Sequence, residues 1–317
     1  MNDVNTYVRE VKSVAIVGTG ALGASWVTLA LARGLSVVAS DPAPGAEQRL
    51  LEAVRRDLPS TAVNVDELQF SDDVRSAVHN VDLVIEAGPE RLETKQQLFG
   101  TMDSAASPET LLTSSTSGIS PSLLQEACHR HPERVLVAHP FNPPHIMPLV
   151  EVVGGRRTNP AAIDAAMAAF RNLGRKPIHI KHELPGHVAN RLQAALWREA
   201  YHLVGTGVVT AQEIDIAIAN GPGLRWALLG PFATQHLSGG SGGFSHVCEH
   251  LGPATEQWWE DLGTPTLTSD LVKRLVASVD QEFEGRNVSE IRRCRDQLLE
   301  ELMRLKSEWG LDDEVEA

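Results

Sequence analysis

Short apolar runs and longer amphipathic stretches alternate through the first half of the chain. A buried parallel strand shows as a brief continuous apolar run, whereas a helix on a sheet shows apolar positions three and four residues apart. The apolar runs fall at residues 13–17, 37–39, 82–86, 110–114, 135–138, 149–153 and 177–180, and helix-like segments such as 21–33 separate most of them. This alternation predicts a doubly wound parallel sheet with helices on both faces.

The pattern changes near residue 183. Leu184-Pro185-Gly186 is typical of a turn, and the long stretches after it are amphipathic with a helical period, at residues 187–205, 210–220, 267–283 and 288–308. No convincing strand pattern follows the turn. The sequence therefore predicts an α/β domain over residues 1–183 and an all-helical domain over residues 184–317.

Composition narrows the classes of protein. Across 317 residues, 41 acidic side chains against 28 Lys and Arg give a net charge of −13, which disfavours binding to nucleic acid or to an anionic membrane. The three cysteines are widely spaced and suit neither a disulfide framework nor a Cys-x-x-Cys metal site. Neither a signal peptide nor an apolar span of bilayer length is apparent, so we expect a cytoplasmic protein.

A glycine-rich turn follows the first predicted strand. Gly18-Thr-Gly20-Ala21-Leu22-Gly23 matches G-x-G-x-x-G and opens a predicted helix. In this context the first glycine permits a tight turn, the second lets the backbone approach a pyrophosphate, and the third allows close helix–strand packing. A turn used only for packing is the alternative, but the pattern favours a Rossmann-type dinucleotide site that includes Ala21 and Leu22.

Asp41 ends the second predicted strand, where a carboxylate accepts hydrogen bonds from the adenosine ribose. A 2′-phosphate at that position would be repelled, and residues 42–48 contain no cation. The sequence therefore predicts NAD, not NADP, as the cofactor.

Candidate acid–base chemistry lies at His139-Pro-Phe-Asn142-Pro-Pro and at Glu151. An imidazole exchanges protons near neutral pH, and a carboxylate on its second nitrogen fixes the tautomer. His139 ends one predicted strand and Glu151 lies in the next, so the two side chains can meet across adjacent strands. Spacing alone is equally consistent with a solvent-facing histidine and an unrelated glutamate.

These motifs together resemble the 3-hydroxyacyl-CoA dehydrogenase superfamily over nearly the whole chain. The matching segments are Gly18–Gly23, Glu90, Thr116-Ser117, His139–Pro143, Leu149–Glu151 and Pro185–Arg191. The resemblance implies that His139 is the general base for a 3-hydroxyl group and that Glu151 orients it. It implies further that Ser117 and Asn190 hydrogen-bond the reacting oxygen. Helix capping is the alternative for both of those residues.

The same resemblance assigns supporting positions. Asn142 matches a polar group beside the His–Glu pair, Glu90 a residue near the nicotinamide ribose, and Lys95 a basic position in the following helix. It also implies a homodimer formed through the helical domain.

Substrate choice depends on two segments. Residues 42–81 contain no lysine, so cations for the phosphates of CoA are poorly supplied there. Gly221–Phe232 resembles a segment shared by L-carnitine dehydrogenase and L-gulonate 3-dehydrogenase, which act on free 3-hydroxy carboxylates. Arg225 would then bind a carboxylate, and Trp197, Trp226 and Phe232 are candidate walls for a trimethylammonium group. A surface or interface role for Arg225, and core packing or a dimer interface for the aromatic residues, stay open.

Two further patterns are disfavoured. Gly239-Gly-Ser241-Gly-Gly243 matches the hydrolase motif G-x-S-x-G, but it does not follow a strand, so a flexible turn is expected. His179, His182, Glu183 and His187 straddle a strand end and a turn, so no metal site is predicted.

The sequence thus predicts an NAD-dependent L-3-hydroxy acid dehydrogenase that acts on a small free carboxylate, carnitine-like or L-gulonate-like. Two alternatives stay open. One is a short-chain L-3-hydroxyacyl-CoA dehydrogenase, and the other is a non-catalytic NAD-binding protein of the crystallin kind.

Overall fold

The computed structural model describes Tyr7 and residues 10–58 and 68–311. The chain forms two compact units, Met1–Arg191 and Leu192–Ala317. The domain boundary predicted from the sequence, between residues 183 and 184, stays a prediction.

The first unit is built on an eight-stranded sheet with the order β3-β2-β1-β4-β5-β6-β7-β8. The strands are β1 (Ser13–Val17), β2 (Ser36–Ser40), β3 (Leu68–Ser71), β4 (Leu83–Glu86), β5 (Leu111–Ser114), β6 (Val135–Pro140), β7 (Leu149–Gly154) and β8 (Lys176–Ile180). All neighbouring pairs are parallel except β6 and β7. The predicted doubly wound α/β fold is confirmed, with one antiparallel pair that the sequence pattern did not indicate.

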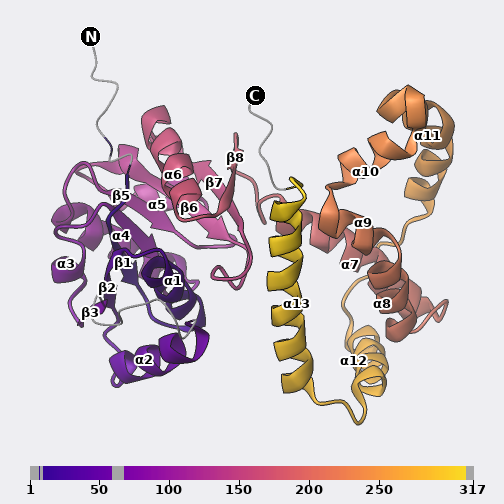
Figure 1. Ribbon diagram of the computed structural model, residues 1–317, viewed down its shortest axis with the longest axis horizontal. Coiled ribbons are helices and arrows are strands. Elements are labelled where there is room, and N and C mark those ends of the chain that lie inside the picture. Colours follow the sequence, from indigo (N-terminus) through magenta and orange to yellow (C-terminus); the bar gives the residue numbers. More distant parts are fainter. Residues whose placement is uncertain (1–6, 8–9, 59–67, 312–317) are drawn as a thin grey trace. The chain divides into compact units, whose positions relative to one another are not determined.

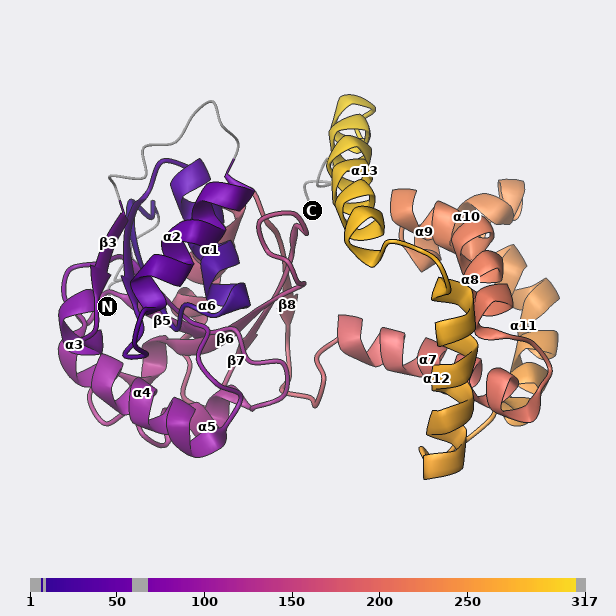
Figure 2. The same ribbon diagram turned by 90° about the horizontal axis from the view of Figure 1, so that it is seen from below.

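Helices cover both faces of this sheet. They are α1 (Ala21–Ala32), α2 (Ala46–Asp57), α3 (Val74–Ala77), α4 (Leu92–Ala105), α5 (Pro121–Gln125) and α6 (Pro160–Asn172). Figure 2 shows α1, α2 and α6 on one side and α3, α4 and α5 on the other. One buried cluster holds Trp26 and Phe170 and the other holds Phe99 and Met102. A fully buried side chain of this size contributes about 1.5–3 kcal/mol, so the two clusters hold the three layers together.

The second unit is helical, as predicted. Its first helix, α7 (Ala189–Thr206), begins in the last three residues of the first unit. The other elements are α8 (Ala211–Asn220), α9 (Pro222–Leu228), α10 (Pro231–Ser238), a 3₁₀ turn (Gly240–Gly242), α11 (Gly243–Asp261), α12 (Ser269–Phe283) and α13 (Val288–Glu308) (Figure 1). The glycine-rich segment expected as a flexible turn forms the 3₁₀ turn and the start of α11. No helix in the described ranges is long and apolar enough to cross a membrane.

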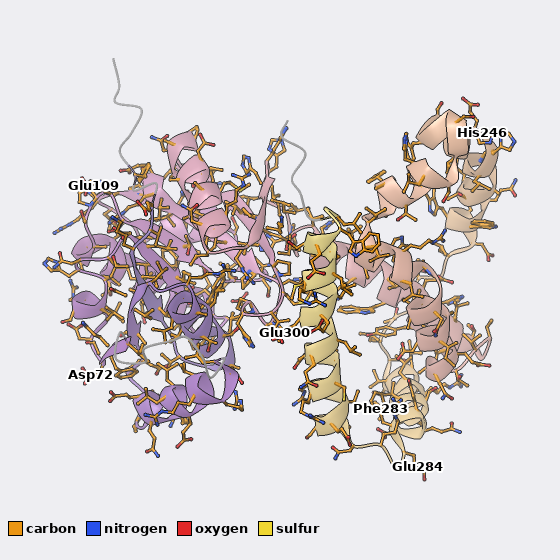
Figure 3. All side chains as sticks on the ribbon, viewed as in Figure 1. Asp72, Glu109, His246, Phe283, Glu284 and Glu300 are labelled. Atoms are coloured by element: carbon orange, nitrogen blue, oxygen red, sulfur yellow. The ribbon has the colours of Figure 1, made fainter. Side chains whose placement is uncertain are left out.

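Polar contacts fix the ends of several helices in the second unit. Thr210 and Glu213 form a capping box at the start of α8, and Arg274 of α12 donates to the carbonyl of Gly205 at 2.9 Å. Phe283 ends α12 (Figure 3). The guanidinium of Arg286 lies 5.3 Å from the centre of the Phe283 ring. These contacts set the helix ends. Large apolar side chains of the same helices stay exposed, among them Val272 and Val276 of α12.

Candidate active site

The turn between β1 and α1 has the geometry of a dinucleotide-binding loop. Gly18 adopts φ +96°, and a Cβ on Gly23 would lie 1.9 Å from the carbonyl oxygen of Gly18, so both positions exclude a side chain. A Cβ on Gly20 would meet nothing within 4 Å. The space beside Gly20 and the free amides at the start of α1 therefore suit a pyrophosphate.

Asp41 follows β2 and is held by the same loop. Its Oδ2 accepts from the amide of Thr19 at 2.9 Å and from the Thr19 hydroxyl at 3.1 Å, and its Oδ1 accepts from the amide of Ala43 at 2.9 Å. These donors keep the carboxylate half-buried at the carboxyl end of β2. The residues present fit NAD, because this is where a carboxylate meets the adenosine ribose in such folds.

His139 and Glu151 face each other across β6 and β7. They are directly paired in the antiparallel register, and His139 Nδ1 lies 2.9 Å from Glu151 Oε2. Glu151 is fully buried and His139 is 7% exposed. The other carboxylate oxygen of Glu151 accepts from the amides of Val188 and Ala189 at 2.8 and 2.9 Å. Adjacent strands thus bring the pair together, as the sequence suggested.

These contacts determine how the pair is protonated. Burial alone would raise the pKa of Glu151, but hydrogen bonds from His139, Ala189 and Val188 outweigh it and the pKa is lowered. The carboxylate is therefore ionised near neutral pH. Because an ionised carboxylate only accepts, the hydrogen lies on His139 Nδ1 and the Nε2 atom is left free to accept a proton.

The loop after β5 carries Ser117 and is held by Glu90. Glu90 Oε1 accepts from the Thr116 hydroxyl at 2.5 Å and from the amides of Ser117 and Gly118 at 3.1 and 3.2 Å. Burial opposes ionisation of Glu90, but the Thr116 hydroxyl and Lys95 outweigh it and the pKa is lowered. Glu90 therefore acts as an anion that shapes the Ser117 loop.

Lys95 lies almost entirely inside the protein. Its Nζ is 2.8 Å from both carboxylate oxygens of Glu86 and 3.5 Å from Glu90 Oε2. Glu86 Oε2 also accepts from the Ser114 hydroxyl at 2.6 Å. Removing either partner of such a pair would leave a buried unpaired charge, which is strongly destabilising. Lys95 thus supplies one positive charge between two carboxylates in the wall of the site.

A cavity of about 340 Å³ joins these parts. Its lining combines the glycine-rich turn with the polar residues, namely Gly20, Ala21, Leu22, Ala87, Gly88, Glu90, Lys95, Ser115, Ser117, His139, Pro140 and Asn142. Most of the predicted catalytic and cofactor residues therefore share one cleft at the carboxyl ends of the strands, where ligands bind in open α/β sheets.

The remaining predicted residues lie elsewhere. Asn190 is half-buried in the first turn of α7. Within the helical unit, Arg225 lines a cavity of about 280 Å³ with Leu228 and Thr234. Trp197 lines another of about 270 Å³, and Trp226 is 44% exposed. The role of these residues as substrate contacts stays a prediction.

Sequence reasoning did not assign a role to His187 or to Thr116. His187 is buried, and its ring centre lies 4.9 Å from that of His139. Thr116 Oγ1 bonds Glu90 and also accepts from the amide of Ile119 at 2.9 Å. Both residues lie within segments that carry the family resemblance, Thr116-Ser117 and Pro185–Arg191, and that membership was the available signal.

Family models match both halves of the chain. Residues 13–183 match the NAD binding domain of 3-hydroxyacyl-CoA dehydrogenase, and residues 186–278 match its C-terminal domain. Two curated relatives are L-carnitine dehydrogenases. The protein from Bacillus cereus is 42% identical over 308 residues, which covers 95% of this chain and 94% of that protein. The protein from Pseudomonas putida is 43% identical over 300 residues, which covers 92% and 93%.

A solved structure with the same architecture is that of 5-formyl-3-hydroxy-2-methylpyridine 4-carboxylic acid 5-dehydrogenase, described as an NAD⁺-dependent dismutase. It is 28% identical, with a TM-score of 0.79 over 94% of this chain and 99% of that chain.

Proposed function

The chain belongs to the 3-hydroxyacyl-CoA dehydrogenase family and is an NAD-dependent 3-hydroxy acid dehydrogenase, and from this premise we propose that it oxidises C3 of L-carnitine or of a closely similar small L-3-hydroxy carboxylate. The observation that carries the proposal is the 2.9 Å contact between His139 Nδ1 and Glu151 Oε2 at a cleft that also contains the dinucleotide-binding turn. The names of the relatives support the choice of substrate.

In the proposed reaction His139 Nε2 takes the proton of the 3-hydroxyl group. NAD⁺, when bound, supplies the acceptor for the hydride that leaves C3. As the proton arrives, the ionised Glu151 stabilises the imidazolium that forms. In the reverse direction the imidazolium returns the proton to the oxygen of the ketone.

Side chains near His139 would hold the reacting oxygen. Ser117 and Asn142 line the same cleft as His139, and Asn190 follows Ala189, the first residue of α7, whose amide donates to Glu151. We assign the hydrogen bonds to the reacting oxygen to Ser117 and Asn190, while Asn142 keeps the cleft polar beside the His–Glu pair.

The ends of the substrate are assigned to the helical unit. A carboxylate suits the planar guanidinium of Arg225, and a trimethylammonium group suits the faces of Trp197 and Trp226. The absence of lysine from residues 42–81 supports a free acid over a CoA thioester. Part of that segment, residues 59–67, lies outside the described residues.

A substrate panel tests the proposal. L-Carnitine, D-carnitine, L-gulonate and L-3-hydroxybutyrate would each be offered with NAD⁺, and acetoacetyl-CoA with NADH, while the NADH absorbance is followed. We expect L-carnitine to give a kcat/KM at least about tenfold above the other compounds, equivalent to about 1.4 kcal/mol. Rapid NADH oxidation by acetoacetyl-CoA without carnitine turnover would favour an acyl-CoA dehydrogenase. NADH binding without any turnover would favour the non-catalytic alternative.

We also propose that the helical unit pairs with a second copy of the chain. Every residue of α7, α8, α12 and α13 lies within the described ranges, and none of them is buried. Large apolar side chains on α12 and α13 are instead exposed, including Val272, Val276, Leu298 and Leu305. Exposed clusters of large apolar side chains are typical of a protein interface. A second copy is the partner that the family resemblance implies.

A further inference from the structure

His187 has an uncommon backbone conformation. Its φ of +51° is the one positive value among the described residues other than glycine. A left-handed conformation costs a side-chain-bearing residue about 1–2 kcal/mol, so contacts elsewhere must hold it there. The side chain is 3% exposed.

Two contacts hold the imidazole of His187. Its Nε2 lies 3.2 Å from the carbonyl oxygen of Thr116, and its ring stacks on His139 with centres 4.9 Å apart and planes tilted by 32°. Because a carbonyl oxygen only accepts, Nε2 carries the hydrogen. Nδ1 is then a bare acceptor, buried and with no partner among the described residues.

The charge state of His187 follows from these surroundings. Burial lowers its pKa and His139 lowers it further, while the Thr116 carbonyl, Glu151 and Glu90 act in the opposite direction. A proton on Nδ1 would also be a buried donor without an acceptor. The ring is therefore neutral at neutral pH.

His187 also links the segments that carry the proposed catalytic groups. Thr116 directly precedes Ser117, and Val188 and Ala189, which directly follow His187, donate their amides to Glu151. The start of α7, with Asn190, comes next. One imidazole thus contacts the Ser117 loop and the face of His139, and its neighbours fix Glu151.

We propose that His187 is a positioning residue for the dehydrogenase reaction: its ring supports the face of His139, and its Nε2–H fixes the Thr116 carbonyl and with it Ser117. The inference rests on the proposed function, because it assigns His187 a part in the same proton transfer. When a catalytic group is displaced by about 1 Å, the rate can fall by about 100-fold.

The stack has a consequence for pH dependence. During ketone reduction His139 must be protonated, and a neutral His187 ring beside it adds no like charge. A protonated His187 would instead repel it, and the nearby anions Glu151 and Glu90 would offset only part of that repulsion. Because the pKa of His187 is lowered, this repulsion begins only on the acid side of its ordinary value near 6.5. We therefore expect the rate of ketone reduction to fall in that acid range.

Two variants test the proposal. His187→Phe keeps a ring for the stack but neither donates to Thr116 nor titrates, and His187→Asn removes the ring while tolerating the left-handed conformation. We expect both to lower kcat by at least about tenfold with NADH affinity unchanged. The acid-side fall in ketone reduction should disappear in His187→Phe. His182→Phe, at an exposed position five residues earlier in the same segment, is the matched control and should match the wild type.

Wild-type kcat and an unchanged pH profile in both His187 variants would overturn the proposal. A readout that does not need turnover is the ¹⁵N NMR spectrum of histidine side chains, in which His187 should be the neutral Nε2–H tautomer at neutral pH. A protonated ring or the other tautomer would also overturn it. A wild-type protein that shows this tautomer but turns over no substrate would contradict the proposed function instead.

Discussion

At the scale of single residues, the chemistry depends on which atoms already have partners. Glu151 uses Oε1 for the amides of Val188 and Ala189 and Oε2 for His139. This arrangement leaves His139 Nε2 as the free basic atom. The sequence could supply His139 and Glu151 as candidates, because histidine and glutamate in adjacent strands are suited to acid–base work. It could not predict that the amides of Val188 and Ala189 donate to Glu151, because that contact depends on where the chain enters α7.

Replacing Glu151 by glutamine tests the role of the carboxylate. An amide nitrogen opposite His139 Nδ1 would donate rather than accept, and the histidine would shift its hydrogen to Nε2, the wrong atom for a base. We expect kcat to fall by at least about 100-fold, as for other histidines held in the wrong tautomer. NADH affinity, measured by fluorescence titration, should be unchanged. A Glu151→Gln protein with nearly wild-type kcat would show that the carboxylate does not set the tautomer.

At the scale of elements, hydrophobic periodicity predicted most of the sheet and the helical second half. β3 was missed because Leu68–Ser71 is a short edge strand with no buried residue, so it lacks the continuous apolar run of an inner strand. α11 was missed because Gly252 and Pro253 lie inside it, and both residues usually indicate a break. The antiparallel direction of β7 is set by the short connection from β6, which apolar periodicity does not report.

The β1–α1 turn offers a matched pair of glycine substitutions. In Gly23→Ala the new Cβ would meet the Gly18 carbonyl oxygen at 1.9 Å, so we expect a loss of about 1–3 kcal/mol in unfolding free energy. In Gly20→Ala the Cβ meets no protein atom within 4 Å, and stability should change by less than about 0.5 kcal/mol.

NADH binding distinguishes the two roles of these glycines. The Cβ of Gly20→Ala would occupy the space assigned to the pyrophosphate, so the Kd for NADH should rise by at least about tenfold, or about 1.4 kcal/mol. Thermal unfolding and fluorescence titration measure the two effects separately. Wild-type NADH affinity in Gly20→Ala would place the dinucleotide elsewhere.

At the scale of the whole molecule, the proposed function gives the two units different roles. The first contains the cofactor turn and the acid–base pair, and the second contains Arg225 and the tryptophans assigned to the substrate. Reaction class is the more predictable part, since it follows from a few residue types at fixed positions. Substrate identity depends on whether the side chains of Trp197, Trp226 and Arg225 contact the substrate. Residue type alone does not determine that.

Assembly can be tested on α12. Val276 is 52% exposed on the apolar face of this helix, and Val276→Lys would place a charge in the proposed interface. We expect light scattering to show a dimer for the wild type and a monomer for Val276→Lys at micromolar concentration. Gln281→Lys adds the same charge on another side of α12 and should stay dimeric. A monomeric wild type would remove the proposed interface.

The central claim is that His139 carries the proton in the oxidation of a small 3-hydroxy carboxylate, and it is tested most directly by replacing that one side chain. The measurement is the initial rate of NADH formation from L-carnitine and NAD⁺ for the wild type and His139→Gln, with NADH affinity measured in parallel. We predict turnover by the wild type and a rate at least about 100-fold lower for His139→Gln at unchanged NADH affinity. Equal rates for the two proteins would contradict the account.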